Sequence, residues 1–584
     1  MRYRDEWCGR FTEDSVGRHV KVAGWVQRRR NHGGLIFVDL RDRTGLVQLV
    51  FEAESRPSVH QQAQDLRGEF VLSATGTVAA RSPERVNPNL ATGAVEVVVE
   101  GLEVLAAAAT PPFFPEDNLE VDETLRLKYR YIDLRRPRMF HNLLLRHQVV
   151  QAVRQYLGEL GFIDVETPIL TKSTPEGARD FLVPSRLQPG EFYALPQSPQ
   201  LFKQLLMISG FERYYQIARA FRDEDLRADR QPEHTQIDVE MSFIEENDVQ
   251  DVVEGMFAAA FRATLGVEIP TPFPRLTYAE ALARYGSDKP DLRFGMEIVD
   301  VTDLASQIDF RVLSDAVGGG GVVRGLRADG GGRLSRKDVD ELASGAAVFG
   351  AQGILPIWIE SDGVRSPLQK FTTAGQMQAL IDRMSGKSGD LLLFVADRRA
   401  VVEPSLGALR LALATRLEVE RKGWAFAWVL DFPMFEYDQR EDRLKAQHHP
   451  FTKPRVEHLE DLKEKPLELG TYAYDLVLNG VELGSGSLRI SDPRLQEAVF
   501  EALGLGEEEI KAKFGFLVEA MEYGIPPHGG IGLGLDRAVM LMAGESSIRE
   551  VIAFPKTQSG SCPLTDAPSK VTAEQLRELR IRTV

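Results

Sequence analysis

The stretch FRDEDLRADRQPEHTQIDVEMSF, residues 221–243, decides the fold, because a charged loop runs directly into an alternating segment. IDVEMSF alternates apolar and polar residues with the period of two that is typical of a half-buried strand. Taken alone, the charges before it are typical of a solvated surface loop. The strand favours a different interpretation, in which Asp238 and Glu240 point into a cavity that holds cations, a substrate ammonium group or metal-bound phosphates.

Composition limits what kind of protein this is. The chain has 584 residues, 43% hydrophobic and 27% charged, which is typical of a globular protein with several domains. It contains no apolar run of about 18 residues, and its first residues are charged where a signal peptide is apolar. Cys8 and Cys562 lie near opposite ends, which indicates neither a disulfide framework nor a zinc site. We therefore expect a cytoplasmic protein without a zinc cofactor or a membrane partner.

Charge is distributed unevenly along the chain. The net charge of −16 disfavours a general nucleic-acid binder. Residues 1–50 nevertheless hold ten Lys or Arg against six Asp or Glu. This end of the chain is therefore the part that we expect to meet a polyanion.

The first hundred residues predict a small β-barrel. Five segments alternate or form short apolar runs, and a helix-compatible segment follows the third. This order is typical of an OB-fold, although SH3-like barrels give a similar pattern. Arg28, Arg30, Phe37 and Gln48 would then bring cations, a ring and an amide to one face, as RNA-binding sites do. The predicted strands are residues 19–26, 35–40, 46–51, 70–78 and 94–105, and the helical segment is 58–67.

After the barrel, the pattern changes to that of an α/β unit. AAAATPPFFPEDN begins a linker that we place at 107–140. A helix is predicted from Arg146 and ends at Gly161, a residue type that commonly caps helices. IDVETPIL, residues 163–170, then predicts a strand in which Pro168 favours an edge or an interface.

Four further segments carry polar side chains at turns and on strands. PEGARDFLVPSR (175–186) and LPQSPQLFKQLLMISG (195–210) contain loop-to-helix turns. AYDLVLNGVELGSGSLRI (473–490) predicts two antiparallel strands, and HGGIGLGLDRAVMLMAG (528–544) a glycine-rich strand that leads into a helix. Glycine-rich turns commonly serve only backbone geometry, so GIGLGLDR alone is weak evidence for phosphate binding. The polar side chains are Glu176, Ser198, Gln200, Lys203, Asp475, Glu482, Arg489 and Arg537.

Together these segments resemble the class II aminoacyl-tRNA synthetases. GFIDVETPIL, the stretch at 221–243 and GIGLGLDR resemble motifs 1, 2 and 3 of that class. PEGARDFLVPSR, ALPQSPQLFKQ, YGSDKPDLR, HHPFT and AYDLVLNGVELGSGS closely resemble the bacterial-type aspartyl-tRNA synthetases. The likeness covers nearly the whole chain.

The resemblance implies ligation of L-aspartate to tRNA through an aspartyl-adenylate, with ATP as co-substrate and Mg²⁺ as cofactor. Arg222 matches the catalytic arginine that binds the α-phosphate and the substrate carboxylate, and Arg537 matches the one that binds the γ-phosphate. Asp475 and Glu482 match the acidic pair that holds magnesium. His234 stands where a phenylalanine often stacks on adenine, and we expect ATP binding to be retained. The ATP-binding candidates are Arg222, Glu224, Gln231, His234, Glu482, Gly534, Leu535, Asp536 and Arg537.

Recognition of aspartate needs cations for its side-chain carboxylate and acceptors for its ammonium group. Lys203 and Arg489 match the family's carboxylate-binding pair. Glu176, Gln200 and Asp238 match positions near the ammonium group, and either His448 or His449 belongs to a loop that approaches the substrate. The aspartate-binding candidates are Glu176, Ser198, Gln200, Lys203, Arg222, Asp238, His448, His449 and Arg489.

In the barrel, the resemblance implies recognition of the anticodon, and His32 bears on which tRNA is charged. A leucine at its position accompanies enzymes restricted to tRNA(Asp), and a histidine accompanies enzymes that also charge tRNA(Asn). The alternative is that His32 is an exposed turn residue without such a role. The anticodon-binding candidates are Arg28, Arg30, Phe37, Gln48, Arg81, Asn87 and Glu96.

The expected fold is a multidomain α+β protein and, because motif 1 forms the dimer interface in this class, a homodimer. It combines an N-terminal OB-fold β-barrel, a class II synthetase antiparallel sheet with flanking helices, and an α/β insertion domain without an evident chemical role. The expected ranges are 1–106 for the anticodon-binding barrel, 107–140 for the linker, 141–288 for the first catalytic part, 289–420 for the insertion, and 421–584 for the second catalytic part with a C-terminal extension.

Two alternative functions stay open at this point. A sister enzyme for asparagine or lysine would leave Lys203 or Arg489 unpaired against the substrate side chain, at a cost of roughly 1–3 kcal/mol or more. A non-enzymatic, synthetase-like RNA-binding protein would be expected to have lost parts of the site. Both signature arginines and both metal-binding acids are present, which opposes that second alternative.

Overall fold

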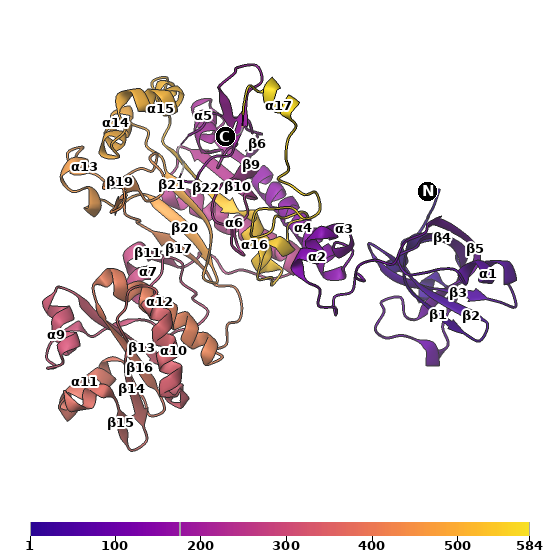
Figure 1. Cartoon of the computed structure of the whole chain (residues 1–584), viewed down its shortest axis with the longest axis horizontal. Helices are drawn as coiled ribbons and strands as arrows, with labels where there is room; N and C mark the ends of the chain where they lie inside the picture. Colours follow the sequence, from indigo (N-terminus) through magenta and orange to yellow (C-terminus); the bar gives the residue numbers. More distant parts are fainter. Residues whose placement is uncertain (1, 175–176, 583–584) are drawn as a thin grey trace. The chain divides into compact units, whose positions relative to one another are not determined.

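The computed structural model describes residues 2–174 and 177–582, which form two compact units (Figure 1). None of the described helices is long and apolar enough to cross a membrane. Of the described residues, the first unit comprises 2–143 with 553–557 and 561–568, and the second comprises 144–174 and 177–552 with 558–560 and 569–582.

The first unit contains a closed five-stranded barrel in the order β1-β2-β3-β5-β4. The β3–β5 pair is parallel and the other four pairs are antiparallel. A helix, α1 (Pro57–Ala63), follows the third strand, which is the order of an OB-fold. The prediction of five strands and one helix is confirmed. The strands are β1 (His19–His32), β2 (Leu35–Asp42), β3 (Gly45–Glu52), β4 (Val71–Ala80) and β5 (Val95–Ala106).

Strand β1 continues beyond Val26, where the predicted alternation stops. A β-bulge between Val26 and Arg28 shifts the register of the pairing with β2. The first half of β1 pairs with β4 and the second half with β2, so the arginines of the second half lie on a barrel strand and not in a loop.

The predicted linker contains two short helices, α2 (Glu123–Lys128) and α3 (Arg130–Asp133). The buried carboxylate of Asp133 accepts hydrogen bonds from Arg126 and Arg130 at 2.9 and 2.6 Å. Helix α4 then runs over Pro137–Glu159, starting earlier than Arg146 because proline is well suited to a first helical turn. Its end agrees with the prediction, since Gly161 adopts a φ of +79° and Phe162 N donates to Leu157 O.

The second unit is built on an eight-stranded sheet in the order β11-β17-β20-β21-β22-β10-β9-β6. The terminal pairs β11–β17 and β6–β9 are parallel, and the pairs between them are antiparallel. Apolar side chains of the sheet and of helices α4, α6 (Glu246–Leu265) and α16 (Leu535–Met542) form one core. The strands are β6 (Ile163–Asp164), β9 (Arg213–Phe221), β10 (Glu233–Ser242), β11 (Arg275–Thr277), β17 (Phe426–Leu430), β20 (Ala473–Leu478), β21 (Val481–Leu488) and β22 (His528–Gly534).

The glycines of β22 make room for the acids of β10. Asp238 lies opposite Gly532 in the strand register, and Glu240 lies opposite Gly530. A Cβ atom at Gly530 would come within 2.0 Å of Val239 O and 2.2 Å of a Glu240 carboxylate oxygen. Glycine is therefore required at this position for close backbone approach. The strand does lead into a helix, and Arg537 stands in its first turn as predicted.

The strand predicted from IDVETPIL is mostly absent. Only Ile163–Asp164 forms strand β6, and Pro168 lies beyond it. Proline cannot donate a ladder hydrogen bond, which fits the early end of the strand. The edge position is confirmed, because β6 is the last strand of the sheet.

Residues 299–416 form a second, five-stranded sheet in the order β12-β13-β16-β14-β15, with helices on both faces. The predicted strands ILPIWIE and LLLFVAD form β14 and β16, which are adjacent strands of this sheet. Helices α10 and α12 pack on one face, and α8, α9 and α11 on the other. The elements are β12 (Val299–Asp300), α8 (Thr302–Ala305), α9 (Arg311–Gly318), β13 (Val322–Ala328), α10 (Arg336–Ala347), β14 (Leu355–Glu360), β15 (Gly363–Arg365), α11 (Ala374–Arg383), β16 (Leu391–Asp397) and α12 (Arg399–Arg416).

The remaining elements of the second unit surround the large sheet. They are β7 (Leu182–Pro184), β8 (Phe192–Ala194), α5 (Gln200–Ile208), α7 (Tyr278–Tyr285), β18 (Phe435–Asp438), β19 (Arg443–Ala446), α13 (Asp461–Glu464), α14 (Pro493–Ala502), α15 (Glu507–Met521) and α17 (Ala573–Glu578).

Candidate active site

A cleft of about 470 Å³ opens on the large sheet and brings most of the predicted site residues together. They come from α5 and the residues just before it, from β10 and the loop before it, from the loop after β19, from β20, from β21 and the residue after it, and from the junction of β22 with α16. Glu176 lies outside the described residues. The predicted residues that line the cleft are Ser198, Gln200, Lys203, Arg222, Glu224, Gln231, His234, Asp238, His448, His449, Asp475, Glu482, Arg489, Gly534, Asp536 and Arg537.

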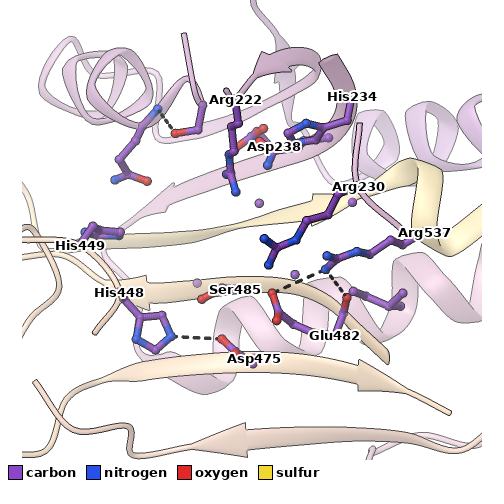
Figure 2. A pocket seen from close by; sticks show the side chains of 18 of the residues that line it. Arg222, Arg230, His234, Asp238, His448, His449, Asp475, Glu482, Ser485 and Arg537 are labelled. Carbon is purple, nitrogen blue, oxygen red and sulfur yellow. Dashed lines mark hydrogen bonds and ion pairs between the residues drawn. The ribbon is translucent and has the colours of Figure 1, made fainter. Parts of the chain in front are cut away.

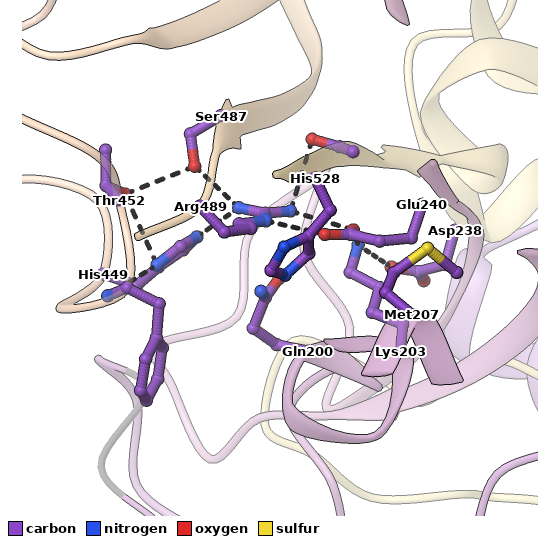
Figure 3. Close-up of polar contacts among 12 residues, drawn as sticks. Gln200, Lys203, Met207, Asp238, Glu240, His449, Thr452, Ser487, Arg489 and His528 are labelled. Carbon is purple, nitrogen blue, oxygen red and sulfur yellow. Dashed lines mark hydrogen bonds and ion pairs between the residues drawn. The ribbon is translucent and has the colours of Figure 1, made fainter. Parts of the chain in front are cut away.

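A buried cluster of two cations and two acids forms one end of the cleft (Figure 3). Lys203 Nζ lies 3.2 Å from Asp238 Oδ1 and 3.2 Å from Glu240 Oε2. Arg489 Nε donates to Glu240 Oε1 at 2.9 Å, and its Nη2 donates to Oε2 at 3.2 Å. All four side chains are at most 2% exposed, so their charges must balance one another.

The sequence predicts that Glu240 faces the cleft, and this prediction is wrong. Asp238 lines it, whereas Glu240 lies behind Lys203 and Arg489 and holds both cations in place. Burial acts to raise the pKa of Glu240, but Arg489 and Lys203 outweigh it and hold the pKa at about 2. Burial dominates at Asp238 and raises its pKa, although Lys203 acts to lower it.

The donors of Arg489 are all occupied. Besides Glu240, its guanidinium donates to Ser487 Oγ at 2.7 Å, to Gly530 O at 3.2 Å and to His449 Nε2 at 2.6 Å. Arginine can only donate, so His449 Nε2 accepts and the imidazole is neutral. Burial, followed by the charge of Arg489, lowers the pKa of His449, which agrees with that assignment.

Four polar atoms of the cleft are buried without a hydrogen-bond partner among the described residues. They are Gln200 Nε2, a donor, Gln236 Oε1 and Asp238 Oδ2, which are acceptors, and Nδ1 of His448. Buried polar groups are normally paired, so these atoms indicate where a polar ligand binds. Two acceptors and a donor next to Lys203 suit a molecule with an ammonium and a carboxylate group.

Arginines gather at the other end of the cleft. Figure 2 shows the guanidinium groups of Arg222, Arg230 and Arg537 directed into it. Arg537 donates to Glu482 O at 3.0 Å and to Asp229 Oδ2 at 3.2 Å, and Arg230 lies 3.3 Å from Glu224. Such a group of planar cations suits a polyphosphate.

Two carboxylates face these arginines from the hairpin of β20 and β21. Asp475 accepts from His448 Nε2 at 3.2 Å, and Glu482 lies 3.9 Å from Arg537 Nη1. Asp475 and Glu482 lie on paired strands, and burial and then the charge of Asp475 raise the pKa of Glu482. The turn between their strands, Asn479–Gly480, has positive φ at both residues, as a tight hairpin requires.

His234 is buried beside this arginine group. Burial, and then the charges of Arg222 and Arg537, lower its pKa to about 3. The ring is therefore neutral at physiological pH and can stack on a flat apolar surface.

The residues at the start of α16 divide between cleft and core. Gly534 and Arg537 line the cleft. Leu535 packs into the hydrophobic core. Asp536 accepts from Thr235 N at 2.8 Å and pairs with Arg146, so its carboxylate joins α16 to β10 and α4.

Several cleft residues were missed by the sequence analysis. Gln236 precedes Asp238 by two residues and therefore shares its face of β10, so the same alternation could have found it. Asp229 and Arg230 belong to the charged stretch quoted first. Leu226 also belongs to that stretch, and Asp288, Phe451, Leu483, Gly484, Ser485, Gly486 and Gly532 lie in the other motifs quoted above. Phe432, Gln447 and Ile548 lie outside the quoted motifs and reach the cleft only through the fold.

The barrel candidates form a polar network on the outer surface of their sheet. Arg30 donates to Asp39 at 2.7 Å and to Gln48 at 3.1 Å, and Gln48 donates to Glu96 at 2.8 Å. Arg81 lies 3.5 Å from Glu96, and Arg28 pairs in register with Asp39. Asn87 lies in the loop between β4 and β5, where its side chain accepts from Asn89 N.

His32 is the last residue of β1 and is exposed. Its ring lies 6.3 Å from the ring of Phe37, measured between centroids and tilted by 59°. It therefore adjoins the aromatic residue of the predicted base-binding face, although it also stands next to the turn at Gly33 and Gly34.

Comparison with known proteins gives matches over almost the whole chain. Residues 122–558 match the family described as tRNA synthetases class II (D, K and N), and residues 20–105 match the OB-fold nucleic acid binding domain. An aspartate–tRNA(Asp/Asn) ligase of Symbiobacterium thermophilum is 57% identical, over 99% of this chain and 99% of its own. One of Moorella thermoacetica is 55% identical, over 100% and 97%. An aspartate–tRNA ligase of Geobacillus kaustophilus is 54% identical, over 100% and 99%.

Solved structures share the fold. An asparaginyl-tRNA synthetase from Pyrococcus horikoshii, complexed with asparaginyl-adenylate, superposes with a TM-score of 0.59 at 20% identity, over 94% of this chain and 98% of that one. An aspartyl-tRNA synthetase from Entamoeba histolytica gives 0.56 at 19% identity, over 93% and 89%.

The buried cluster predicts how stability depends on Glu240. Glu240→Gln should lower the free energy of unfolding by about 3 kcal/mol at neutral pH, because it leaves buried cations without their partner. Since the folded pKa is lower than the ordinary 4.5, this contribution is complete above pH 4.5 and is lost as the pH falls towards 2. Urea unfolding at several pH values measures it. Glu268→Gln, which breaks an exposed pair with Arg262, is the control and should change little; equal losses in both variants would contradict the prediction.

Proposed function

This chain belongs to the class II tRNA synthetases of the aspartate, lysine and asparagine group, and from that premise we propose that it ligates L-aspartate to tRNA. The observation that carries the choice of amino acid is the buried pair Lys203 and Arg489 at the closed end of the cleft. A carboxylate satisfies two cations there. An asparagine side chain is neutral and a lysine side chain repels them, which disfavours the sister enzymes.

In the proposed complex the substrate side chain enters beside Lys203. Lys203 donates to Asp238 and forms an ion pair with Glu240, and an ammonium group with three hydrogens retains a donor for the substrate carboxylate. The donors of Arg489 are occupied, so the same carboxylate displaces His449 from its Nη1. The substrate ammonium group donates hydrogen bonds to Asp238 Oδ2 and Gln236 Oε1. We retain Glu176, Ser198, Gln200 and His448 as further contacts of the substrate.

The first step is attack of the aspartate α-carboxylate on the α-phosphorus of ATP. An O–P bond forms, the bond to the β-phosphate oxygen breaks, and pyrophosphate leaves with its electron pair. Arg222 holds the two reacting anions together, and Arg537 binds the γ-phosphate after displacing Asp229. His234 stacks on adenine, and Glu224 and Gln231 contact the nucleotide. We place Gly534, Leu535 and Asp536 along its binding site, where Leu535 contributes backbone only and Asp536 mainly positions α16.

Asp475 and Glu482 would hold Mg²⁺ on the polyphosphate. Mg²⁺ is commonly bound through one or two carboxylates together with substrate phosphates. Two repelling carboxylates opposite the arginines fit that mode, and among the described residues no cluster of three or more His, Cys, Asp or Glu side chains forms a self-sufficient metal site. When bound, the ion would offset negative charge on the phosphates.

The second step transfers aspartate to tRNA. A hydroxyl of the terminal ribose attacks the acyl carbon of the aspartyl-adenylate, the acyl–phosphate bond breaks, and AMP leaves. The barrel would bind the anticodon through Arg28, Phe37 and Gln48, with Arg30, Arg81, Asn87 and Glu96 as weaker candidates. The network that joins Arg30, Gln48, Glu96 and Arg81 supports a common base-binding surface.

We further propose that the chain charges both tRNA(Asp) and tRNA(Asn). The proximity of His32 to Phe37 supports it, because a side chain there can alter how an anticodon base is held. Relatives named for both tRNAs are 57% and 55% identical to this chain, while one named for aspartate–tRNA alone is 54% identical. We also retain 289–420 as a structural insertion domain between the two catalytic parts.

A homodimer through the β6 edge of the sheet is proposed as well. Ile163, Leu170, Phe211 and Phe243 are 46%, 53%, 37% and 68% exposed, and they lie on β6, after β6, before β9 and after β10, the last three strands of the sheet. Ser242 N donates to Glu212 O, so the backbone next to Phe243 lies close to the backbone next to Phe211. A cluster of exposed apolar side chains at a sheet edge favours an interface. Sedimentation at micromolar concentration would show a dimer, and an active monomer would exclude the proposal.

The adenylate step predicts pyrophosphate exchange into ATP that depends on aspartate. Arg222→Ala and Arg537→Ala should each lower the exchange rate by about 100-fold or more, because each removes a cation that offsets charge on the reacting phosphates. Arg262→Ala is the control, since Arg262 is exposed on α6 and pairs only with Glu268 in the described structure. Aspartate-independent exchange, or full activity in both site variants, would contradict the proposed function.

The role of His32 predicts a change in tRNA preference. His32→Leu should lower the charging of a transcript with the asparagine anticodon by about tenfold relative to one with the aspartate anticodon, the effect of one base contact. Aminoacylation with labelled aspartate at matched tRNA concentrations measures the ratio. His19→Leu, an exposed histidine at the other end of β1, is the control. An unchanged ratio in His32→Leu would make His32 an ordinary turn residue.

A further inference from the structure

We propose that Gln197 is a positioning residue that fixes one wall of the aspartate site; this rests on the proposed function. Its side chain is 3% exposed and does not line the active-site cleft. Gln197 Oε1 accepts from Ala178 N at 3.0 Å, and Nε2 donates to Ala178 O at 2.8 Å. Nε2 also donates to Asp180 Oδ1 at 2.6 Å, so one side chain binds the backbone and a side chain of residues 178–180.

The amide of glutamine is uniquely suited to these contacts. Its C=O and N–H groups pair with the backbone N–H and C=O of Ala178, as the backbone of a neighbouring strand would. The second N–H hydrogen reaches Asp180, whose other oxygen accepts from Ser173 Oγ at 2.7 Å. A glutamate has the same shape but lacks both donors, and it would face the Asp180 carboxylate and the Ala178 carbonyl with a negative charge.

The backbone around Gln197 joins the same segment to Arg222. Arg222 Nε donates to Gln197 O at 3.4 Å, and Phe221 N donates to Pro196 O at 2.9 Å. On the other side, Leu195 N donates to Phe181 O at 2.9 Å. Residues 195–198 therefore lie between the 178–181 segment and the end of β9, and the side chain of Gln197 adds the contacts that the backbone does not make.

The residue after Gln197 lies between two cavities. Ser198 lines the active-site cleft and a second, mainly apolar cavity of about 270 Å³. Asp180 and Gln197 line the second cavity only. The hydrogen bond between Gln197 and Asp180 therefore lies on the side of residues 195–198 that faces the second cavity, whereas Ser198 also faces the cleft. Loss of that bond would let Ser198 and Arg222 shift relative to the substrate.

The wall is expected to act on aspartate more than on ATP. ATP is held from many elements, including α16, and Arg222 in the loop before β10 contacts the backbone carbonyl of Gln197, a contact in which the Gln197 side chain takes no part. Aspartate is the smaller ligand and lies against Ser198, Arg222 and the chain that follows Glu176. A small displacement of positioning groups lowers the rate strongly, because reacting groups must be closely aligned.

The test is the KM for aspartate and for ATP in pyrophosphate exchange. Gln197→Glu should raise the KM for aspartate by about tenfold or more, while the KM for ATP changes by less than about threefold. The double variant Gln197→Glu with Asp180→Asn should recover part of the loss, because asparagine can donate to the new carboxylate and still accept from Ser173. Gln378→Glu is the matched control, since Gln378 donates to Asp382 at 2.8 Å on the exposed surface of α11.

The outcomes separate this inference from the proposed function. Absence of aspartate-dependent exchange in the unchanged protein would remove the proposed function itself. An active protein in which Gln197→Glu leaves the KM for aspartate unchanged would overturn the role of Gln197. Equal rises in both KM values without recovery in the double variant would overturn it as well. If Gln197→Glu does not unfold cooperatively, Gln197→Met, which keeps the length without adding charge, is measured in its place against the same two criteria.

Discussion

The ion pair between Arg489 and Glu240 is the interaction on which the active-site architecture depends. Both side chains are buried, and an unpaired charge at that depth would cost several kcal/mol. The pair is possible because Gly530 leaves space for the carboxylate between adjacent strands. Glu240 also holds Lys203, so a single acid fixes the two cations that we assign to the substrate side chain. The specificity of the site and the packing of three neighbouring strands therefore rest on the same contact.

Charge separates the cleft into two ends with different tasks. The closed end has two cations, two acids and three unsatisfied polar atoms, which suit a small zwitterion with an extra carboxylate. The open end has three arginines facing two carboxylates, which suit a polyphosphate with a divalent cation. Arg222 lies between them, where an α-carboxylate and an α-phosphate must meet. In this account, the antiparallel order of β20, β21, β22 and β10 places both ends on one surface.

Much of this arrangement could be predicted from the sequence, and the failures have physical reasons. Alternation in IDVEMSF predicts strand β10 and its acidic face, but a period of two cannot tell that Glu240 is covered by Arg489, a residue 249 positions away. The barrel strands were predicted, whereas the extension of β1 depends on a bulge that breaks the alternation. Pro168 indicated an edge correctly, although the strand ends before it. Gln197 could not be found, because its partners at 178–180 become neighbours only through the tertiary fold.

The most direct test of the account is the choice of amino acid in pyrophosphate exchange. The unchanged protein is supplied with L-aspartate, L-asparagine or L-lysine at equal concentrations, and kcat/KM is measured for each. The account predicts that aspartate is preferred by on the order of 10⁴-fold, because only its carboxylate satisfies both Lys203 and Arg489. Comparable values for asparagine or lysine would contradict the assignment of the buried cations to the substrate side chain.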